Sequence, residues 1–517
     1  MMTMALDRRT LIKLAGGSTV AMLAGGAPAL VLAQSTPAAV AAGELVIGKG
    51  QEAVGFDPGV VTAASSFDLI SVVYERLVEF DEAGDPQPML AESWDIPDDK
   101  TYVFTLRPDV TFHNGQPLTA ADVKHTFDRI KDEATASPRV AQFTSVESIE
   151  ATDDHTVTFH LNAPYGPFLA TLSSGFASIV PADDSIDLQA QMVGTGPFKL
   201  ESWKQDTETV LTAFDDYRIA EEPKIATLRY RIMPEESARL AAIRTGEIQL
   251  TAITDPLTVE SAKQSEGVEV LEQDTTDYYL LGLNCAEPPF DDPKVRQALS
   301  LAIDRQAIID AVFFGRGQVS GPIVPTMGDW AQPVEDLPNY AVDRDQAKAL
   351  LKEAGASDLT FKIVVGSLYQ EFENIALVIQ DQLAEIGVTV ELEPVEWGTF
   401  IDRWIARDFQ SFVSYNSSGD DPDGALYSAF ITDGGTNAFQ YSDPKVDELL
   451  ETGRATTDPD ARRSTYQELE TVLAEQAPVV FICTRVGFFA VRDTVSGFAP
   501  TVAQTWSTLS QTTVEQG

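Results

Sequence analysis

The stretch SYNSSGDDPDGALYS, residues 414–428, gathers the side chains of this sequence that are most able to bind a ligand or a metal. It places Asp420, Asp421 and Asp423 around a proline and between two glycines. Carboxylate oxygens suit Ca²⁺, but an EF-hand-type loop ends in a glutamate about a dozen residues from its start. Here nothing acidic follows Asp423 before Asp433. Asp-Asp-Pro-Asp-Gly is also strong turn chemistry, so we predict a turn or a ligand-contacting loop rather than a metal site.

Catalytic chemistry has few candidates in this sequence. The four histidines, His113, His125, His155 and His160, all come before residue 161. His155 and His160 are five residues apart on a predicted strand, so they face opposite sides and are not expected to share a metal. Neither a Gly-x-Ser-x-Gly elbow nor a His-Glu-x-x-His pair occurs, although hydrolases commonly carry one of them. A secreted hydrolase is therefore a distant alternative to a binding protein.

The elements that must position these residues alternate in the second half of the chain. Apolar residues recur at helical spacing in 292–315, 343–355 and 375–387, and each segment ends in glycine. Asp292 is a predicted N-cap of the first helix, and the alternating strand VTVEL, 388–392, follows the last. Strands and helices that alternate in this way predict an α/β fold with βαβ units and a parallel sheet.

The first half of the chain is predicted to be richer in strands. Alternating apolar residues predict strands in 43–50, 100–115 and 155–161. Helical spacing predicts a helix over 66–81, and a second helix is expected to begin with Thr119 as its N-cap.

Length and charge narrow the class of protein. A chain of 517 residues exceeds what one hydrophobic core usually fills, so two or three lobes are expected. The 79 acidic and 36 basic residues give a net charge of −43. Such a surface repels phosphate backbones, so no nucleic-acid partner is expected. The acidity is compatible with solubility, a saline habitat or a cationic ligand.

The N-terminus has the pattern of an export signal. Arg8 and Arg9 precede an apolar, glycine-containing segment, 14–32, which ends in the small-residue site VLAQS. The pattern indicates a signal peptide over residues 1–33 of the twin-arginine type, cleaved near Ala33, with an ordinary secretory signal as the alternative. No cysteine lies at the cleavage site, so a soluble periplasmic protein is expected.

Two cysteines, Cys285 and Cys483, complete the inventory of reactive groups. In an oxidising compartment two thiols can pair. Two buried, unpaired thiols are the alternative, and the sequence leaves both open.

Six blocks together resemble the solute-binding proteins of ABC importers, in the peptide, oligopeptide and nickel-binding family known as family 5. They follow one another along nearly the whole chain after the signal segment. They are VVYERLVEFDEAGDPQPMLAESWDIPDDKTYVFTLRPDVTFHNGQPLTAADVKHTFDRI (72–130), VGTGPFKLESW (193–203), LAAIRTGEIQL (240–250), LGLNCAEPPFDDPKVRQALSLAIDRQAII (281–309), IQDQLAEIGVTVELEPVEW (379–397) and YSDPKVDELL (441–450).

The resemblance implies a two-lobed periplasmic binding protein of type II, from the large cluster with an extra inserted domain. Its expected layout has lobe I in 34–80, 190–282 and 485–517, the insert in 80–190, and lobe II in 283–484. The chain would cross the hinge at YYLLGLNC (278–285) and PVVFICTRV (478–486), which places the two cysteines near the hinge.

The resemblance also implies where charged groups should hold a peptide. Peptide binders of this family carry an aspartate four residues before the proline of the DPD turn, and that position is Ser418 here. Dipeptide binders also carry an arginine near the start of the helix before IQ, where this sequence has Glu371 and Glu373. Both expected charge anchors are therefore absent from these positions. The candidate ligand-binding residues are Phe56, Ser65, Ser66, Tyr369, Glu371, Trp397, Tyr415, Asn416, Ser417, Ser418 and Asp420.

The expected function is a periplasmic solute-binding subunit that closes about a hinge on a peptide or peptide-like solute. It would deliver the solute to an ABC permease in the inner membrane, act as a monomer, and need no cofactor and no metal. A non-peptide solute, such as a sugar, opine, polyamine or metal chelate, is the alternative in the same fold. The predicted lobe II holds no histidine, so nickel would not be bound there by histidine.

Overall fold

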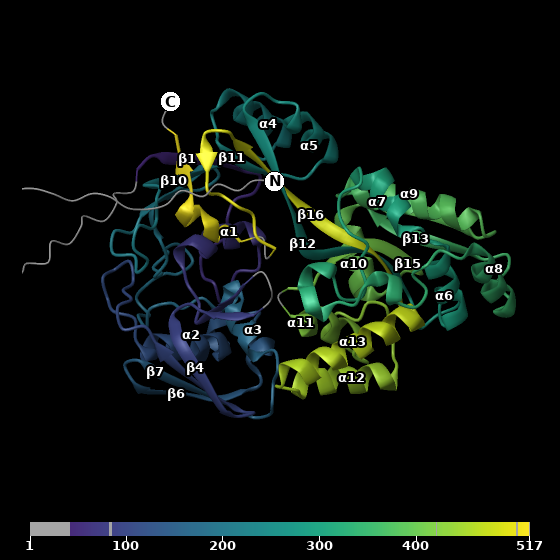
Figure 1. Ribbon diagram of the computed structural model, residues 1–517, viewed down its shortest axis with the longest axis horizontal. Helices are drawn as coiled ribbons and strands as arrows, with labels where there is room; N and C mark the ends of the chain where they lie inside the picture. The colour runs from purple at the N-terminus through teal and green to yellow at the C-terminus, as the bar shows by residue number, and fades with distance from the viewer. Residues whose placement is uncertain (1–41, 82–84, 420, 503–504, 516–517) are drawn as a thin grey trace, which may run out of the picture. The chain divides into compact units, whose positions relative to one another are not determined.

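The computed structural model describes residues 42–81, 85–419, 421–502 and 505–515 (Figure 1). The predicted signal peptide, its cleavage near Ala33 and the candidate Asp420 lie outside these residues.

The largest element is a ten-stranded mixed sheet. Its strands, in spatial order, are β14 (Thr389–Val395), β13 (Thr360–Gly366), β15 (Ser411–Ser417), β12 (Val268–Leu283), β16 (Val479–Arg492), β11 (Leu250–Ile253), β1 (Glu44–Lys49), β10 (Thr227–Ile232), β9 (Glu208–Ala213) and β8 (Phe198–Lys204).

Strands β12 and β16 run side by side through the middle of this sheet (Figure 1). They are 16 and 14 residues long, well above the usual strand length of about five or six. The other edge of β12 pairs with β15, and the other edge of β16 pairs with β11. Their pairing is interrupted between Asp274 and Tyr278, whose partners are Val486 and Thr484. The long pair therefore joins two groups of strands, one of β13, β14 and β15 and the other of β11, β1, β10, β9 and β8. The pair is irregular at its centre.

Strands β13, β14 and β15 form the parallel part predicted for the second half of the chain. β13 pairs in parallel with both β14 and β15. The predicted α/β class with a parallel βαβ arrangement is confirmed here.

Helices cover both faces of this part of the sheet. One face packs against α6 (Pro293–Ala302), α7 (Arg305–Phe313), α8 (Arg344–Glu353) and α9 (Gln370–Ala384). The other packs against α10 (Trp397–Ala406), α11 (Pro422–Phe430), α12 (Pro444–Ala455) and α13 (Pro459–Gln476). Because successive side chains of a strand alternate, Tyr279 belongs to the first core and its neighbour Tyr278 to the second.

Two helices differ from the sequence expectation. The segment 292–315 forms α6 and α7 rather than one helix, because Ile303 is extended and the Asp304 side chain accepts a hydrogen bond from Ala307 N at 3.0 Å. The helix expected over 66–81 is α1 (Ala64–Val73), which ends where Tyr74 becomes extended. The predicted cap Asp292 is confirmed, since it accepts from Lys294 N at 2.8 Å.

The remaining strands of the large sheet have their own cores. Helix α1 packs on β1 and β10, and α4 (Glu236–Thr245) and α5 (Pro256–Lys263) form a smaller core beside β11. Two small antiparallel sheets pair β2 (Val78–Phe80) with β3 (Pro86–Pro88) and β17 (Val495–Ser496) with β18 (Thr513–Val514).

A separate four-stranded antiparallel sheet forms from residues 91–161. Its order is β4 (Ala91–Asp98), β5 (Thr101–Leu106), β7 (Thr156–Leu161) and β6 (Val146–Asp153), and it packs with α2 (Ala120–Lys131) and α3 (Phe168–Ser173) around an independent core. The predicted N-cap Thr119 forms a capping box with Asp122. This separate core supports the predicted insert, while the boundaries of the insert and of the two lobes stay predictions.

Two further findings concern the whole described chain. Cys285 and Cys483 are both free thiols, and burial raises the pKa of Cys285 to about 11. No helix among the described residues combines the length and the apolar character that a bilayer crossing requires.

Candidate ligand-binding site

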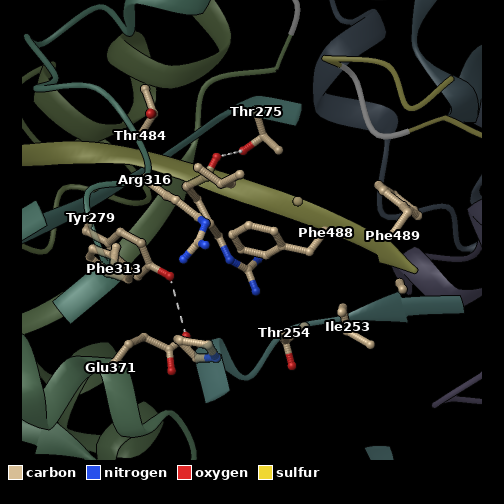
Figure 2. Close-up of a pocket in the computed structure, with 15 residues that line it drawn as sticks. Ile253, Thr254, Thr275, Tyr279, Phe313, Arg316, Glu371, Thr484, Phe488 and Phe489 are labelled. Atoms are coloured by element: carbon tan, nitrogen blue, oxygen red, sulfur yellow. Dashed lines mark hydrogen bonds between the residues drawn. The ribbon is translucent and has the colours of Figure 1, made fainter. Parts of the chain in front are cut away.

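A cavity of about 120 Å³ lies beside the long strands β12 and β16 (Figure 2). Residues on both sides of the long pair line it. On one side they come from the end of β11 and the start of α5, and on the other from the end of α7 and the start of α9. The middle of the long pair contributes the rest. The lining residues are Ala252, Ile253, Thr254, Pro256, Thr275, Tyr279, Phe313, Arg316, Glu371, Thr484, Arg485, Val486, Gly487, Phe488 and Phe489.

The irregularity between β12 and β16 shapes one wall of this cavity. Three residues of β12, Thr275 to Asp277, lie opposite the single residue Arg485 of β16. Thr275 holds the irregularity together, because its hydroxyl donates to Arg485 O at 2.9 Å and accepts from Asp277 N at 3.1 Å. Extra residues in one strand re-aim the neighbouring side chains and often do so at functional sites. One hydrogen bond therefore still ties Arg485 to β12 although the regular ladder is broken.

Arg485 brings a positive charge to this wall. Its Nη1 lies 3.6 Å from Asp277 Oδ2, and its guanidinium lies 4.7 Å from the centre of the Tyr415 ring. Burial opposes the charge, but the neighbouring Tyr279, Tyr415, Asp277 and Glu371 favour it, so the pKa of Arg485 lies above its ordinary value. Arg485 is therefore charged at every physiological pH.

A second arginine of the cavity, Arg316, is already paired. Its Nη2 contacts Glu260 and its Nε lies 3.1 Å from Glu272. Phe488 covers it, with the ring centre 5.9 Å from the guanidinium (Figure 2). Lys263 shares Glu272, so Arg316 and Lys263 together face two carboxylates.

Glu371 brings a negative charge to the cavity from the first turn of α9. Tyr279 OH points toward it and donates a long hydrogen bond, 3.4 Å, to Glu371 Oε1 (Figure 2). Tyr279 stacks on Phe313 at 4.8 Å, and burial raises the pKa of Tyr279 far above its ordinary value. The phenol therefore stays protonated and orients the carboxylate.

Three predicted site residues form an aromatic cluster next to this cavity. The ring of Tyr369 lies 5.3 Å from Trp397 and 5.8 Å from Tyr415. They come from the carboxyl ends of β13 and β14 and from β15, which lie together at one edge of the parallel strands. Burial raises the pKa of Tyr369 to about 12, with a further contribution from Tyr415. The cluster joins the cavity through the contact of Tyr415 with Arg485.

The end of β15 and the residue that follows it lie partly elsewhere. Asn416 and Ser417 line a second cavity together with Trp404 and Gly424. Ser418 is 1% exposed, its backbone N donates to Thr276 O at 3.0 Å, and its hydroxyl has no hydrogen-bond partner among the described residues.

The aspartates of this loop serve the helix that follows. Asp421 caps α11 by accepting from Asp423 N at 2.8 Å. Asp421 also forms two hydrogen bonds of 2.6 Å with Arg462, and Asp423 forms bonds of 3.0 and 2.6 Å with Arg454. The sequence predicted the backbone role of the turn but not these two ion pairs.

The candidates from the first part of the chain lie in a core. Phe56 is fully buried and its ring lies 4.8 Å from Trp203. Ser65 and Ser66 belong to the first turns of α1 rather than to a loop, and their hydroxyls bond backbone groups of Glu52 and Val54. Neither cavity includes these three candidates.

The structure thus brings Tyr369, Trp397, Tyr415 and Glu371 together and leaves the other described candidates apart. Sequence reasoning missed other residues of the cavity, including Arg316, Tyr279 and the charged Arg485. For Arg485 a signal was present. The available signal was a lone arginine in the otherwise apolar segment PVVFICTRV.

Comparison with known proteins identifies the class of this fold. The family model of the bacterial extracellular solute-binding proteins, family 5, matches residues 85–437. The dipeptide-binding protein of Escherichia coli strain K12 is 32% identical over 486 residues, which cover 86% of this chain and 90% of that protein.

Solved structures agree with this comparison. The ABC transporter substrate-binding protein CtaP from Listeria monocytogenes superimposes with a TM-score of 0.84 at 27% identity, over 92% of this chain and 100% of that chain. The periplasmic binding protein DppA from Helicobacter pylori, solved in complex with the peptide STSA, has a TM-score of 0.75 at 28% identity and covers 92% of this chain and 98% of its own. The fold is that of the two-lobed binding proteins, and the chain belongs to family 5 of the bacterial extracellular solute-binding proteins.

Proposed function

We propose that this protein is the periplasmic solute-binding subunit of an ABC importer and that its solute is a short peptide or a peptide-like molecule. The observation that carries the proposal is the cavity at the centre of β12 and β16, which is lined by residues from both sides of this strand pair. The chain that forms it belongs to a family of solute-binding proteins. The relatives named as dipeptide-binding support the class of solute.

The mechanism would be closure about a hinge. A solute that contacts Thr254 on one group and Glu371 on the other favours the arrangement in which both reach it. The irregular centre of the long strand pair offers the place where the backbone can bend. The closed protein would deliver the solute to a permease as a monomer, without catalysis and without a cofactor.

The proposed contacts combine charge and aromatic surface. Glu371 would face a positive group of the solute, while Tyr369, Trp397 and Tyr415 would pack on its side chains. Ser418 carries a buried hydroxyl without a partner among the described residues, and such a group favours a ligand that can hydrogen-bond with it.

A thermal-shift panel tests the class of solute. We expect a di- or tripeptide among Ala-Ala, Ala-Phe, Ala-Lys, Ala-Glu and Ala-Ala-Ala to stabilise the protein. The gain is about 2.7 kcal/mol when the free peptide exceeds Kd by about a hundredfold. Sugars, opines, polyamines and nickel–histidine form the comparison panel. Stabilisation by one of these and by none of the peptides would contradict the proposed peptide class.

A matched pair of variants tests the site. Trp397→Ala should weaken binding of the best peptide by about tenfold, because the ring packs in the aromatic cluster. Trp404→Ala is the control, since Trp404 is on the same helix but lines the second cavity. Equal affinity of both variants for the peptide would show that the aromatic cluster does not contact the solute.

A further inference from the structure

Arg485 lines the cavity with hydrogen-bonding capacity to spare. Its side chain is 24% exposed, and its nearest carboxylate oxygen among the described residues, on Asp277, is 3.6 Å away. In the same molecule, Arg462 contacts both oxygens of Asp421 at 2.6 Å. A guanidinium has five N–H donors, so the donors of Arg485 are not saturated by a close carboxylate as those of Arg462 are.

Neighbouring residues nevertheless hold both the side chain and the backbone of Arg485 in this arrangement. The Tyr415 ring supports its guanidinium at 4.7 Å, and Thr275 holds its backbone carbonyl at 2.9 Å. Stacking on an aromatic ring leaves the edge of the guanidinium plane available for two parallel hydrogen bonds. Such a fork fits a carboxylate, whose two oxygens can each accept one bond.

The surrounding charges restrict what else the solute can carry. Arg316 lies between Glu260 and Glu272, Arg485 lies near Asp277, and Glu371 adds a fourth carboxylate. Lys263 also contacts Glu272, so two arginines and one lysine stand against four carboxylates, and these seven side chains carry a net charge of −1. The group disfavours a solute with several negative charges and favours a carboxylate accompanied by a positive group.

We propose that Arg485 binds the terminal carboxylate of the solute through two parallel N–H···O bonds, and that Glu371 faces the positive group of the same solute. The inference rests on the proposed function and deepens it. The arginine expected at the start of α9 is absent, and the structure provides a guanidinium from β16 instead.

The test measures affinity by calorimetry for the best-binding peptide of the panel and for its C-terminal amide. The wild-type protein should bind the amide roughly 30-fold more weakly or worse, because the fork then loses its charged acceptor. Arg485→Gln should bind the free peptide with a similar loss and no longer distinguish acid from amide. Arg485→Lys should recover part of the affinity, since it keeps the charge but not the fork.

Arg492→Gln is the matched control on the same strand but outside the cavity. Because Arg492 pairs with Asp493 and does not line the cavity, this variant should keep the wild-type affinity and the wild-type ratio between acid and amide. Circular dichroism of each variant confirms folding before binding is measured. If Arg485→Gln still prefers the acid by the wild-type ratio, the inference fails while the proposed function stands. If the wild-type protein binds neither acid nor amide of any peptide, the proposed function fails and the inference falls with it.

Discussion

At the scale of single residues, Glu470 on α13 is a buried carboxyl group that forms no ion pair with any residue the structure describes. Its side chain accepts hydrogen bonds from Gln332 N at 2.8 Å and from Ile323 N at 3.3 Å. Burial raises its pKa from 4.5 to about 7, against the smaller opposing effect of these bonds. Between pH 4.5 and about 7, the carboxyl is therefore mostly protonated in the folded protein and mostly ionised in the unfolded chain.

The pH dependence of the free energy of unfolding follows from the upward direction of this pKa shift. Because the folded pKa lies above the unfolded one, the contribution of Glu470 is complete below pH 4.5 and is lost as the pH rises through 7. The difference corresponds to about 3 kcal/mol. Urea unfolding across this range should show that Glu470→Gln lacks this fall in stability. Glu475→Gln, at an exposed site of the same helix, should retain it. If both variants lose the same free energy of unfolding between pH 4.5 and 7, Glu470 is not the group responsible.

Sequence reasoning at this scale recovered part of the candidate site. Tyr369, Trp397, Tyr415 and Glu371 follow from the resemblance and do lie together. Arg485 could not be placed, because its orientation depends on an irregular pairing with residues some two hundred positions earlier in the chain. Such a register is a property of two strands in contact, and neither strand shows it alone.

At the scale of elements, α11 is held at its start by two ion pairs, of which the Arg462–Asp421 pair is the more deeply buried. Arg462 is 5% exposed and binds both oxygens of Asp421, the capping residue of α11. Removal of one partner leaves the other charge buried and uncompensated. The start of this helix therefore depends on a side chain from α13.

Arg462→Met is expected to lower the free energy of unfolding by about 3–5 kcal/mol, as measured by urea denaturation. The neighbouring Arg463→Met is the control, because Arg463 pairs with the exposed Asp460 and exposed pairs contribute at most about 1 kcal/mol. A loss of less than 1 kcal/mol for Arg462→Met would show that the pair does not hold the helix.

Elements were predicted well where their signals are local. The cap at Asp292 and the capping box at Thr119 depend on residues two or three positions apart, and both formed. The break between α6 and α7 was missed because the apolar spacing continues through it. There, capping by Asp304 outweighs the continuous helical pattern.

At the scale of the whole molecule, 79 acidic residues against 36 basic ones dominate the electrostatics. Self-repulsion destabilises a compact state of high net charge, and salt screens it. Raising NaCl from about 0.05 M to about 1 M should therefore raise Tm near pH 7. Near pH 4, where many carboxyl groups are protonated, the same change should have little effect. An equal increase at both pH values would point to a general salt effect instead.

The order of synthesis gives the long strand pair another consequence. β16 lies between β12 and β11 in the sheet, yet it is made after both of them and after every helix from α1 to α13. A nascent chain that ends before Val479 holds β12 and β11 but lacks β16, the strand that pairs with both of them. Folding unit by unit from the N-terminus, the common course for large chains, cannot complete this sheet. The ribosome must release almost the entire polypeptide before the central ladder can close.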